Sequence, residues 1–238
     1  MITQLHLGDI KVEIVRKDIK NVHLSVHPPT GRVRIAAPRW LKDETIRLFA
    51  ISKLPWIRKQ QKKLEEQIRE TPREYLERES HFLWGRRYLM KVNESDAMPS
   101  VEVRPHHIVL NVRRSTSRAK RRELFEQWNR EQLKKAIPPL VEKWEGIISV
   151  KVRFWGVKRM KTKWGSCIAT TGRIWLNLDL VRKSPACLEY VVVHEIVHLI
   201  ERKHDEKFIS LMTRYLPQWK QLRSDLNAFP LSHAEWEY

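Results

Sequence analysis

Two histidines one helical turn apart constrain this chain more than any other feature. They lie at the ends of the segment 194–198, whose sequence is HEIVH. Ser184 is a favourable helix N-cap and Pro185 a favourable first helical residue, so a helix should begin there and include the segment. On such a helix His194 and His198 project from the same face. Two imidazoles in this arrangement can bind one Zn²⁺, each at about 2.0–2.1 Å.

A catalytic zinc ion takes a third protein ligand and keeps one position open. His204 is the candidate, ten residues after His194. On a continuous helix it would point about 80° away from His194 and lie about 9 Å beyond His198 along the axis. The helix must therefore end near Arg202, although no glycine is present there to ease the turn. Glu195 is carried beside the metal without having to bind it, where a base can take a proton from an activated water.

Further segments accompany these histidines: RMKTKWGSC at 159–167, IWLN at 174–177, EYVVVHEIVH at 189–198, and His204 followed by Phe208. Together they resemble the YgjP-like metallopeptidase family, a relative of the SprT and WLM zinc peptidases, and the resemblance extends over nearly the whole chain. It implies a zincin-like catalytic domain. The implied ligands are His194, His198 and His204, and the implied catalytic residue is Glu195.

Other residues near the motif are candidates for contact with substrate or transition state. Lys163, Lys161 or Arg159 is suited to stabilising an oxyanion, and the alternative is a surface cation. Trp164 is expected to pack below the site, where the following glycine lets this segment approach the helix closely. Asn177 either borders the substrate or is a structural amide bonded to backbone.

Three more side chains near the site have open roles. Cys167 as a nucleophile or a fourth ligand has no supporting base in the sequence. The ligand imidazoles need acceptors for their other ring nitrogens, and Glu189 and Asp205 are the nearby carboxylates. The sequence does not choose between these two.

The arrangement of apolar positions predicts an α+β fold, because strands precede helices without a regular alternation. Expected strands occupy 10–15, 22–26, 33–37, 81–92, 101–112, 150–157 and 172–178. Expected helices occupy 43–69, 118–147 with a break at Pro138-Pro139, 185–200, 206–216 and 218–226. We expect an N-terminal domain of β-hairpins plus a helix over 1–75, then a β region and the catalytic domain over 76–238. No internal repeat is evident.

Lys and Arg number 46 against 28 Asp and Glu, a formal charge of +18. Such a surface attracts nucleic acid or another polyanion, and a solvated basic face is the alternative. The longest apolar stretch, 190–200, is interrupted by two histidines and a glutamate, so no membrane span is expected. With no evident secretory signal and only two cysteines, a cytoplasmic location is the expectation.

The sequence therefore predicts a zinc-dependent metallopeptidase that hydrolyses peptides or unfolded protein through a metal-activated water. A substrate strand is expected to pair with a sheet edge near 172–178. One alternative is a zinc-dependent hydrolase of nucleotides or phosphate esters, suggested by the charge. Another is a nucleic-acid-associated protein with a structural metal site.

Overall fold

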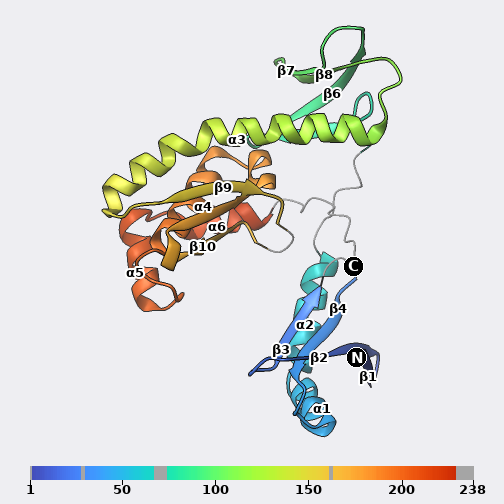
Figure 1. Ribbon diagram of the computed structural model, residues 1–238, viewed down its shortest axis with the longest axis vertical. Coiled ribbons are helices and arrows are strands. Elements are labelled where there is room, and N and C mark those ends of the chain that lie inside the picture. The colour runs from blue at the N-terminus through green and yellow to red at the C-terminus, as the bar shows by residue number, and fades with distance from the viewer. Residues whose placement is uncertain (1, 28–29, 67–73, 161–162, 229–238) are drawn as a thin grey trace. The chain divides into compact units, whose positions relative to one another are not determined.

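The computed structural model describes residues 2–27, 30–66, 74–160 and 163–228. The chain divides into two compact units, 1–69 and 70–238, and each contains its own hydrophobic core. Helices and sheets are both present, and the N-terminal unit is rich in strands, so the expected α+β class is confirmed (Figure 1). Among the described residues, no helix has both the length and the apolar character needed to cross a membrane.

The N-terminal unit is a four-stranded sheet packed against two helices. Its elements are β1 (Ile2–Leu7), β2 (Ile10–Lys17), β3 (His23–His27), β4 (Arg32–Pro38), α1 (Asp43–Ser52) and α2 (Leu54–Glu66). The strand order is β1-β2-β4-β3, with β2 and β4 parallel. Alternation along β2 buries Ile10, Val12 and Ile14 against both helices, whose buried residues include Ile46 and Ile57. β1 was not among the expected strands.

The second unit begins with another four-stranded sheet and a long helix. These elements are β5 (Ser80–Leu83), β6 (Arg86–Glu94), β7 (Ser100–Val103), β8 (His107–Val112) and α3 (Arg118–Ile148). The order β5-β6-β8-β7 and the strand directions repeat those of the first sheet. The two units thus share a sheet topology, although the sequence shows no evident repeat.

The expected break of α3 at Pro138-Pro139 is wrong, because the helix is continuous through both prolines. Each proline lacks an N–H and so removes one helical hydrogen bond. The loss is offset by burial on both sides of the pair, since Leu133, Ile137 and Val141 lie in the core of this unit. The helix contacts β7 and β8 as well as β9 and α4, so it joins the second sheet to the rest of the unit (Figure 1).

A three-stranded sheet and three helices complete the unit. They are β9 (Phe154–Lys158), β10 (Gly165–Ile168), β11 (Arg173–Asn177), α4 (Pro185–Val197), α5 (Glu206–Tyr215) and α6 (Trp219–Ala228), with short 3₁₀ segments at Ala169–Thr171 and Leu178–Arg182. The strand order is β10-β11-β9. The expected sheet edge near 172–178 is therefore wrong, because β11 is the central strand. β10 is the edge strand that contacts α4.

Candidate metal centre

The motif lies on α4, which begins as the sequence predicts. The Ser184 hydroxyl accepts a hydrogen bond from the Cys187 N–H, and Pro185 is the first helical residue. Leu188, Val192 and Ile196 are fully or almost fully buried. This helix is thus held by core packing along most of its surface, which fixes the positions of the polar side chains at its C-terminal end.

The chain turns back after α4 without a left-handed residue. α4 ends at Val197. The N–H groups of Leu199 and Ile200 bond carbonyls three residues earlier, and the Glu201 N–H bonds the Val197 carbonyl. All of residues 198–205 are described, and none has a positive φ. Asp205 then caps α5 by accepting the Phe208 N–H at 3.1 Å. The tightened turn and this cap bring His204 back towards α4.

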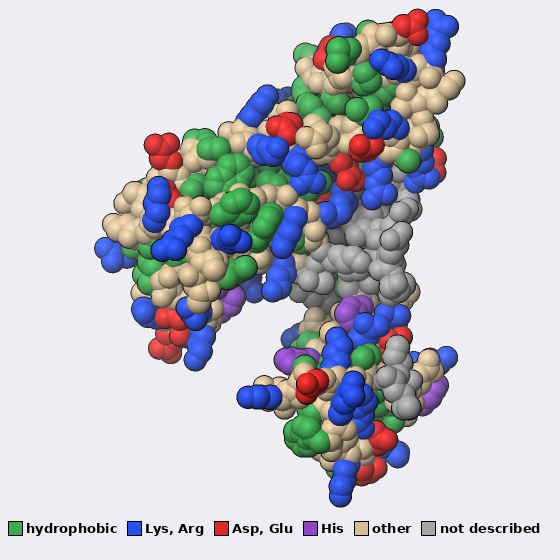
Figure 2. All heavy atoms as spheres, viewed as in Figure 1, with side chains coloured by type: hydrophobic (Ala, Val, Ile, Leu, Met, Phe, Trp, Pro, Cys, Tyr) green, Lys and Arg blue, Asp and Glu red, His purple; other side chains and the backbone are tan. Residues whose placement is uncertain are grey.

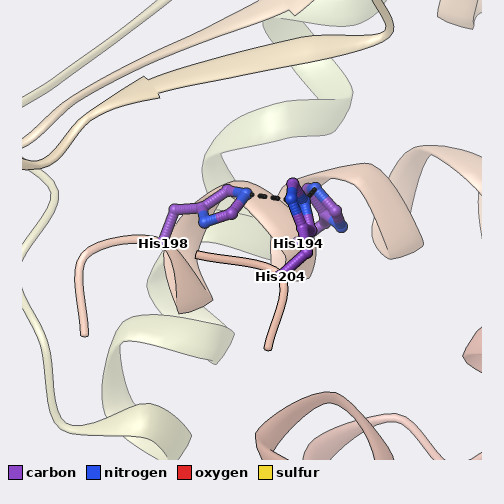
Figure 3. A group of neighbouring side chains, drawn as sticks. All are labelled: His194, His198 and His204. Atoms are coloured by element: carbon purple, nitrogen blue, oxygen red, sulfur yellow. Dashed lines mark hydrogen bonds between the residues drawn. The ribbon is translucent and has the colours of Figure 1, made fainter. Parts of the chain in front are cut away.

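The three imidazoles converge through their Nε2 atoms (Figure 3). His204 Nε2 lies 3.1 Å from His194 Nε2 and 3.2 Å from His198 Nε2. Among the described residues, these three histidines form the group of potential metal ligands whose atoms all lie within 4.8 Å of one another. The potential metal ligands are thus three imidazole nitrogens that lie close to one another.

Hydrogen bonding and burial favour the ligand form of these rings. The Nδ1–H of His198 donates to the Glu201 carbonyl at 2.9 Å, which leaves the Nε2 lone pair directed at the other imidazoles. Burial, followed by the positive charges of the two other imidazoles and Arg223, lowers the pKa of His194 to about 3. Burial and the neighbouring charges also lower the pKa of His204. His194 is therefore neutral at physiological pH.

Phe208 forms an apolar support for the cluster. Its ring centroid lies 5.0 Å from that of His194 and 4.7 Å from those of His198 and His204. The residue is 2% exposed, so it excludes water from one side of the three rings. Its spacing from His204 was visible in the sequence, but contact with all three rings was not predicted.

Glu195 lies beside the cluster and outside it. The side chain is 4% exposed, and burial raises the pKa of Glu195 to about 8, although the charge of Lys163 opposes the rise. A Cβ added to Gly165 of β10 would lie 2.4 Å from Glu195 Oε1. The edge strand can approach the carboxyl this closely only because residue 165 lacks a side chain, as the sequence analysis expected.

A cavity of about 620 Å³ opens onto the imidazoles and Glu195. It is lined by β10, by α4 and α6, and by the segment between α4 and α5. Three of its lining residues are cations, Lys163, Arg202 and Arg223. Among the described residues that line it, Glu195 is the one acid. The cavity is therefore positively charged around a single buried carboxyl.

The predicted oxyanion candidates have different positions. Lys163 lines the cavity and Trp164 lies next to it, with its Nε1–H 3.4 Å from Asn227 Oδ1 on α6. Arg159 instead pairs with Glu126 at 3.0 Å. Lys161 lies outside the described residues. Of the two candidate cations that the structure describes, Lys163 lines the cavity and Arg159 does not.

Asn177 is a buried amide with backbone partners. Its Nδ2 donates to the carbonyls of Met160 and Lys163 at 2.9 and 2.8 Å, and its Oδ1 accepts from the N–H groups of Met160 and Asp179. It is not among the residues that line the cavity. The structural reading of this residue agrees with these contacts, which hold the segment that carries Lys163.

Cys167, Glu189 and Asp205 do not take the roles that the sequence left open for them near the site. Burial, with the charge of Glu195, raises the pKa of the Cys167 thiol to about 11, so at neutral pH it is protonated and a poor nucleophile. Glu189 accepts hydrogen bonds from Lys143 and Trp144, and Asp205 caps α5. Among the described residues, it is the Glu201 carbonyl that accepts a hydrogen bond from a ligand imidazole, that of His198.

Many of the basic residues at the start of α3 are paired with acids. The pairs are Arg118–Glu74, Lys120–Glu123, Arg121–Glu94 and Arg122–Glu126, at 2.6–3.5 Å. Figure 2 shows acidic side chains among the basic ones on the visible face of α3. This part of the surface is a mixed ionic face.

Sequence reasoning missed Tyr190, Arg202 and Arg223 as cavity residues. Tyr190 is one turn before His194, and its ring centroid lies 5.9 Å from the imidazole, so helical spacing from the motif could have identified it. Arg223 is on α6, and no local pattern connects it to the motif.

Two comparisons relate the chain to known proteins. A family model described as YgjP-like, metallopeptidase domain matches residues 20–229. Among solved structures, the metallopeptidase zymogen of Pyrococcus abyssi abylysin is similar over 37% of this chain and 89% of that chain, at 17% sequence identity and a TM-score of 0.35. No curated protein matches significantly.

Proposed function

The chain belongs to the YgjP-like family of metallopeptidases, and from this membership we propose a zinc-dependent peptidase with a three-histidine ligand set. The proposed ligands are His194, His198 and His204, and the proposed proton carrier is Glu195. The observation that carries the proposal is the convergence of three Nε2 atoms beside a buried carboxyl that is not one of the converging ligands.

The donor set fits zinc. Tetrahedral coordination at about 2.0–2.1 Å requires ligand nitrogens about 3.3–3.4 Å apart. The separations of 3.1 and 3.2 Å are close to this spacing. Imidazole also suits copper, iron and nickel, but three protein ligands with a fourth position open are typical of catalytic zinc.

A zinc ion held here would activate a water molecule and polarise the carbonyl of the bond to be cleaved. Glu195 accepts a proton from the attacking water on a carboxylate oxygen as the new C–O bond forms. It then donates that proton to the amine nitrogen as the C–N bond breaks. Burial raises the pKa of Glu195 to about 8 in the metal-free protein, and the positive charge of a bound zinc ion would lower it and favour the carboxylate that accepts the proton. Lys163, on the cavity wall, is the proposed oxyanion-stabilising cation, and Trp164 is proposed to border the substrate.

The proposed substrates are peptides or unfolded protein segments. β10 is an edge strand beside the cluster, and Gly165, Ser166 and Cys167 line the cavity. An extended peptide can pair with such an edge through backbone hydrogen bonds, which gives binding that tolerates many sequences.

The proposal is tested by zinc content and turnover of a reduced, alkylated protein, compared among variants. Glu195→Gln should keep about one zinc per chain and lose about 10²–10⁴-fold in kcat, because the proton carrier is removed. His204→Ala should lose zinc and activity together. His106→Ala removes an exposed histidine of the same unit and should change neither. Full zinc content in His204→Ala would contradict the ligand assignment.

A second candidate is hydrolysis of nucleotides or phosphate esters by the same centre. Three cations around one buried acid favour an anionic substrate. Nucleoside triphosphates and unfolded protein should be offered to the parent protein and to Glu195→Gln under the same conditions. Glu195-dependent turnover of nucleotide alone would replace the peptidase proposal.

A further inference from the structure

Two arginines on the cavity wall have no role in the proposed chemistry. Arg223 is on α6, and Arg202 is in the segment between α4 and α5. Both side chains are exposed and line the cavity. Within the described part of the chain, no ion pair or side-chain hydrogen bond joins either guanidinium to an acid. Arg159, which does not line the cavity, is by contrast paired with Glu126.

The two guanidinium groups act on different parts of the cavity. Arg223 is on α6, which packs against α4, and it lines the cavity together with His194 and His204. The charge of Arg202 acts on the Cys167 thiol of β10 and opposes the rise of its pKa. One arginine is therefore close to the reacting centre, and the other is close to the edge strand.

A guanidinium binds a carboxylate through two parallel N–H···O bonds, and its planar fork favours this geometry over a single contact. Lys163 already acts on Glu195, whereas the two arginines have no acidic partner in the described chain. A substrate carboxylate would supply the missing negative charge.

We propose that Arg223 and Arg202 form an anion-binding rim that selects peptides with a carboxylate near the cleaved bond. The inference rests on the proposed peptidase function and adds the chemical class of its preferred substrate. The carboxylate comes from an acidic side chain or from a free C-terminus, and either source presents the same two oxygens to a guanidinium.

The test uses matched pairs of peptides. Their binding is measured with the inactive Glu195→Gln variant, and their turnover with the parent protein. One pair differs by Glu or Gln in a blocked peptide, and another by a free or amidated C-terminus. The first pair reports a side-chain carboxylate and the second a terminal one. We expect tighter binding and a lower KM for the charged member of at least one pair, with a difference of about tenfold or more. Raising the salt concentration should reduce it.

Arg223→Gln and Arg202→Gln should raise KM for the charged peptide towards that of its neutral partner, with kcat within about twofold. Lys220→Gln removes the same charge from an exposed position of α6 outside the cavity lining and should leave the preference unchanged. Arg223→Lys should restore the preference only in part, because ammonium cannot form the two-pronged contact.

The possible outcomes distinguish a failure of this inference from a failure of the proposed peptidase function. Equal cleavage of charged and neutral peptides by the parent protein would overturn the anion-binding rim and leave the peptidase proposal standing. An equal fall of kcat on both peptides in Arg223→Gln would also overturn it, since Arg223 would then act on the transition state. Cleavage of no peptide would count against the peptidase proposal, while binding to Glu195→Gln would still report the preference.

Discussion

Gly165 and Glu195 occupy adjoining space that no larger residue at 165 can share. A Cβ atom at Gly165 would lie 2.4 Å from Glu195 Oε1 and 2.8 Å from its Cδ. The two residues are on different elements, the edge strand β10 and the helix α4. The backbone of β10 therefore covers the carboxyl directly, and this close approach contributes to the burial that raises the pKa of Glu195.

Gly165→Ala should disable catalysis while sparing metal binding. The added methyl group must displace the Glu195 carboxyl or β10, because separations below about 3.0 Å do not occur at real Cβ atoms. We expect kcat to fall by about 10²-fold or more, as when a general base is misplaced. Turnover and zinc content should be measured together. Unchanged kcat would show that the carboxyl can move without loss of function.

Gly146→Ala is the matched control and a prediction in its own right. Gly146 is an exposed residue of α3, and a Cβ there meets nothing within 4 Å. Alanine should raise the free energy of unfolding by about 0.5–1 kcal/mol, because glycine loses more backbone entropy in a helix. Urea denaturation measures the gain, and peptidase activity should be unchanged. A lower free energy of unfolding would contradict the prediction.

Asn177→Asp should destabilise the segment around Lys163 despite its nearly equal size. The native Nδ2 donates to two backbone carbonyls, and a carboxylate would present lone pairs to those oxygens instead. We expect a loss of about 1–3 kcal/mol in the free energy of unfolding. Denaturation with chemical denaturant measures it. Asn177→Ala serves as the comparison, since it removes the donors without adding charge. If both variants were as stable as the parent, the hydrogen bonds of Asn177 would not stabilise this segment and the prediction would be wrong.

Glu79 should contribute stability that depends on pH. Its carboxylate accepts backbone N–H groups of Glu74, Tyr75 and Leu76 and lies 3.6 Å from His81 Nε2. Burial raises the pKa of Glu79, but these hydrogen bonds and His81 outweigh it, so the pKa is lowered overall.

Because the folded pKa lies below the unfolded value, this stabilisation is present above the unfolded pKa of about 4–4.5 and is lost as the pH falls through the folded pKa. Glu79→Gln should therefore unfold more easily than the parent at pH 7, by about 1–3 kcal/mol. The difference should shrink below pH ~4. Denaturant titration at several pH values measures the difference in the free energy of unfolding between Glu79→Gln and the parent. A difference that stays constant from pH 7 to below pH ~4 would contradict the assignment.

Cys167→Ser should retain zinc and most of the activity. The Cys167 thiol has a pKa of about 11, raised first by burial and then by the charge of Glu195, so the metal-free protein carries it protonated at neutral pH. Alkylation by iodoacetamide, followed by mass spectrometry, should be slow at pH 7 and faster as the pH rises. Zinc loss in Cys167→Ser would make the thiol a ligand and contradict this prediction.

Local signals predicted the elements around the centre well. The Ser184-Pro185 pair correctly marked the start of α4, and helical spacing found α5 and α6 within a few residues. The prediction that the chain must leave the helix before His204 also agrees with the structure. The helix boundaries depend on neighbouring residues alone, so a single sequence contains them. The return of His204 was inferred from the need for a third ligand.

Features set by distant residues were not predicted. Four residues of β10 carry no alternating pattern, and the central position of β11 follows from its pairing with strands on both sides. The burial that keeps α3 continuous through Pro138 is likewise tertiary. Arg223 reaches the cavity only because α6 packs against α4. The sequence therefore predicted the proposed metal ligands better than the other residues that line the cavity.

The separate cores of the two units have a consequence for how the chain tolerates change. The apolar cluster under the first sheet and the one that supports α4 have no residue in common. A cavity-forming substitution at Ile35, in the first cluster, should lower the melting temperature of that unit alone. Heating should then give two calorimetric transitions. Substitutions that accumulate in one unit should leave the fold of the other unit intact.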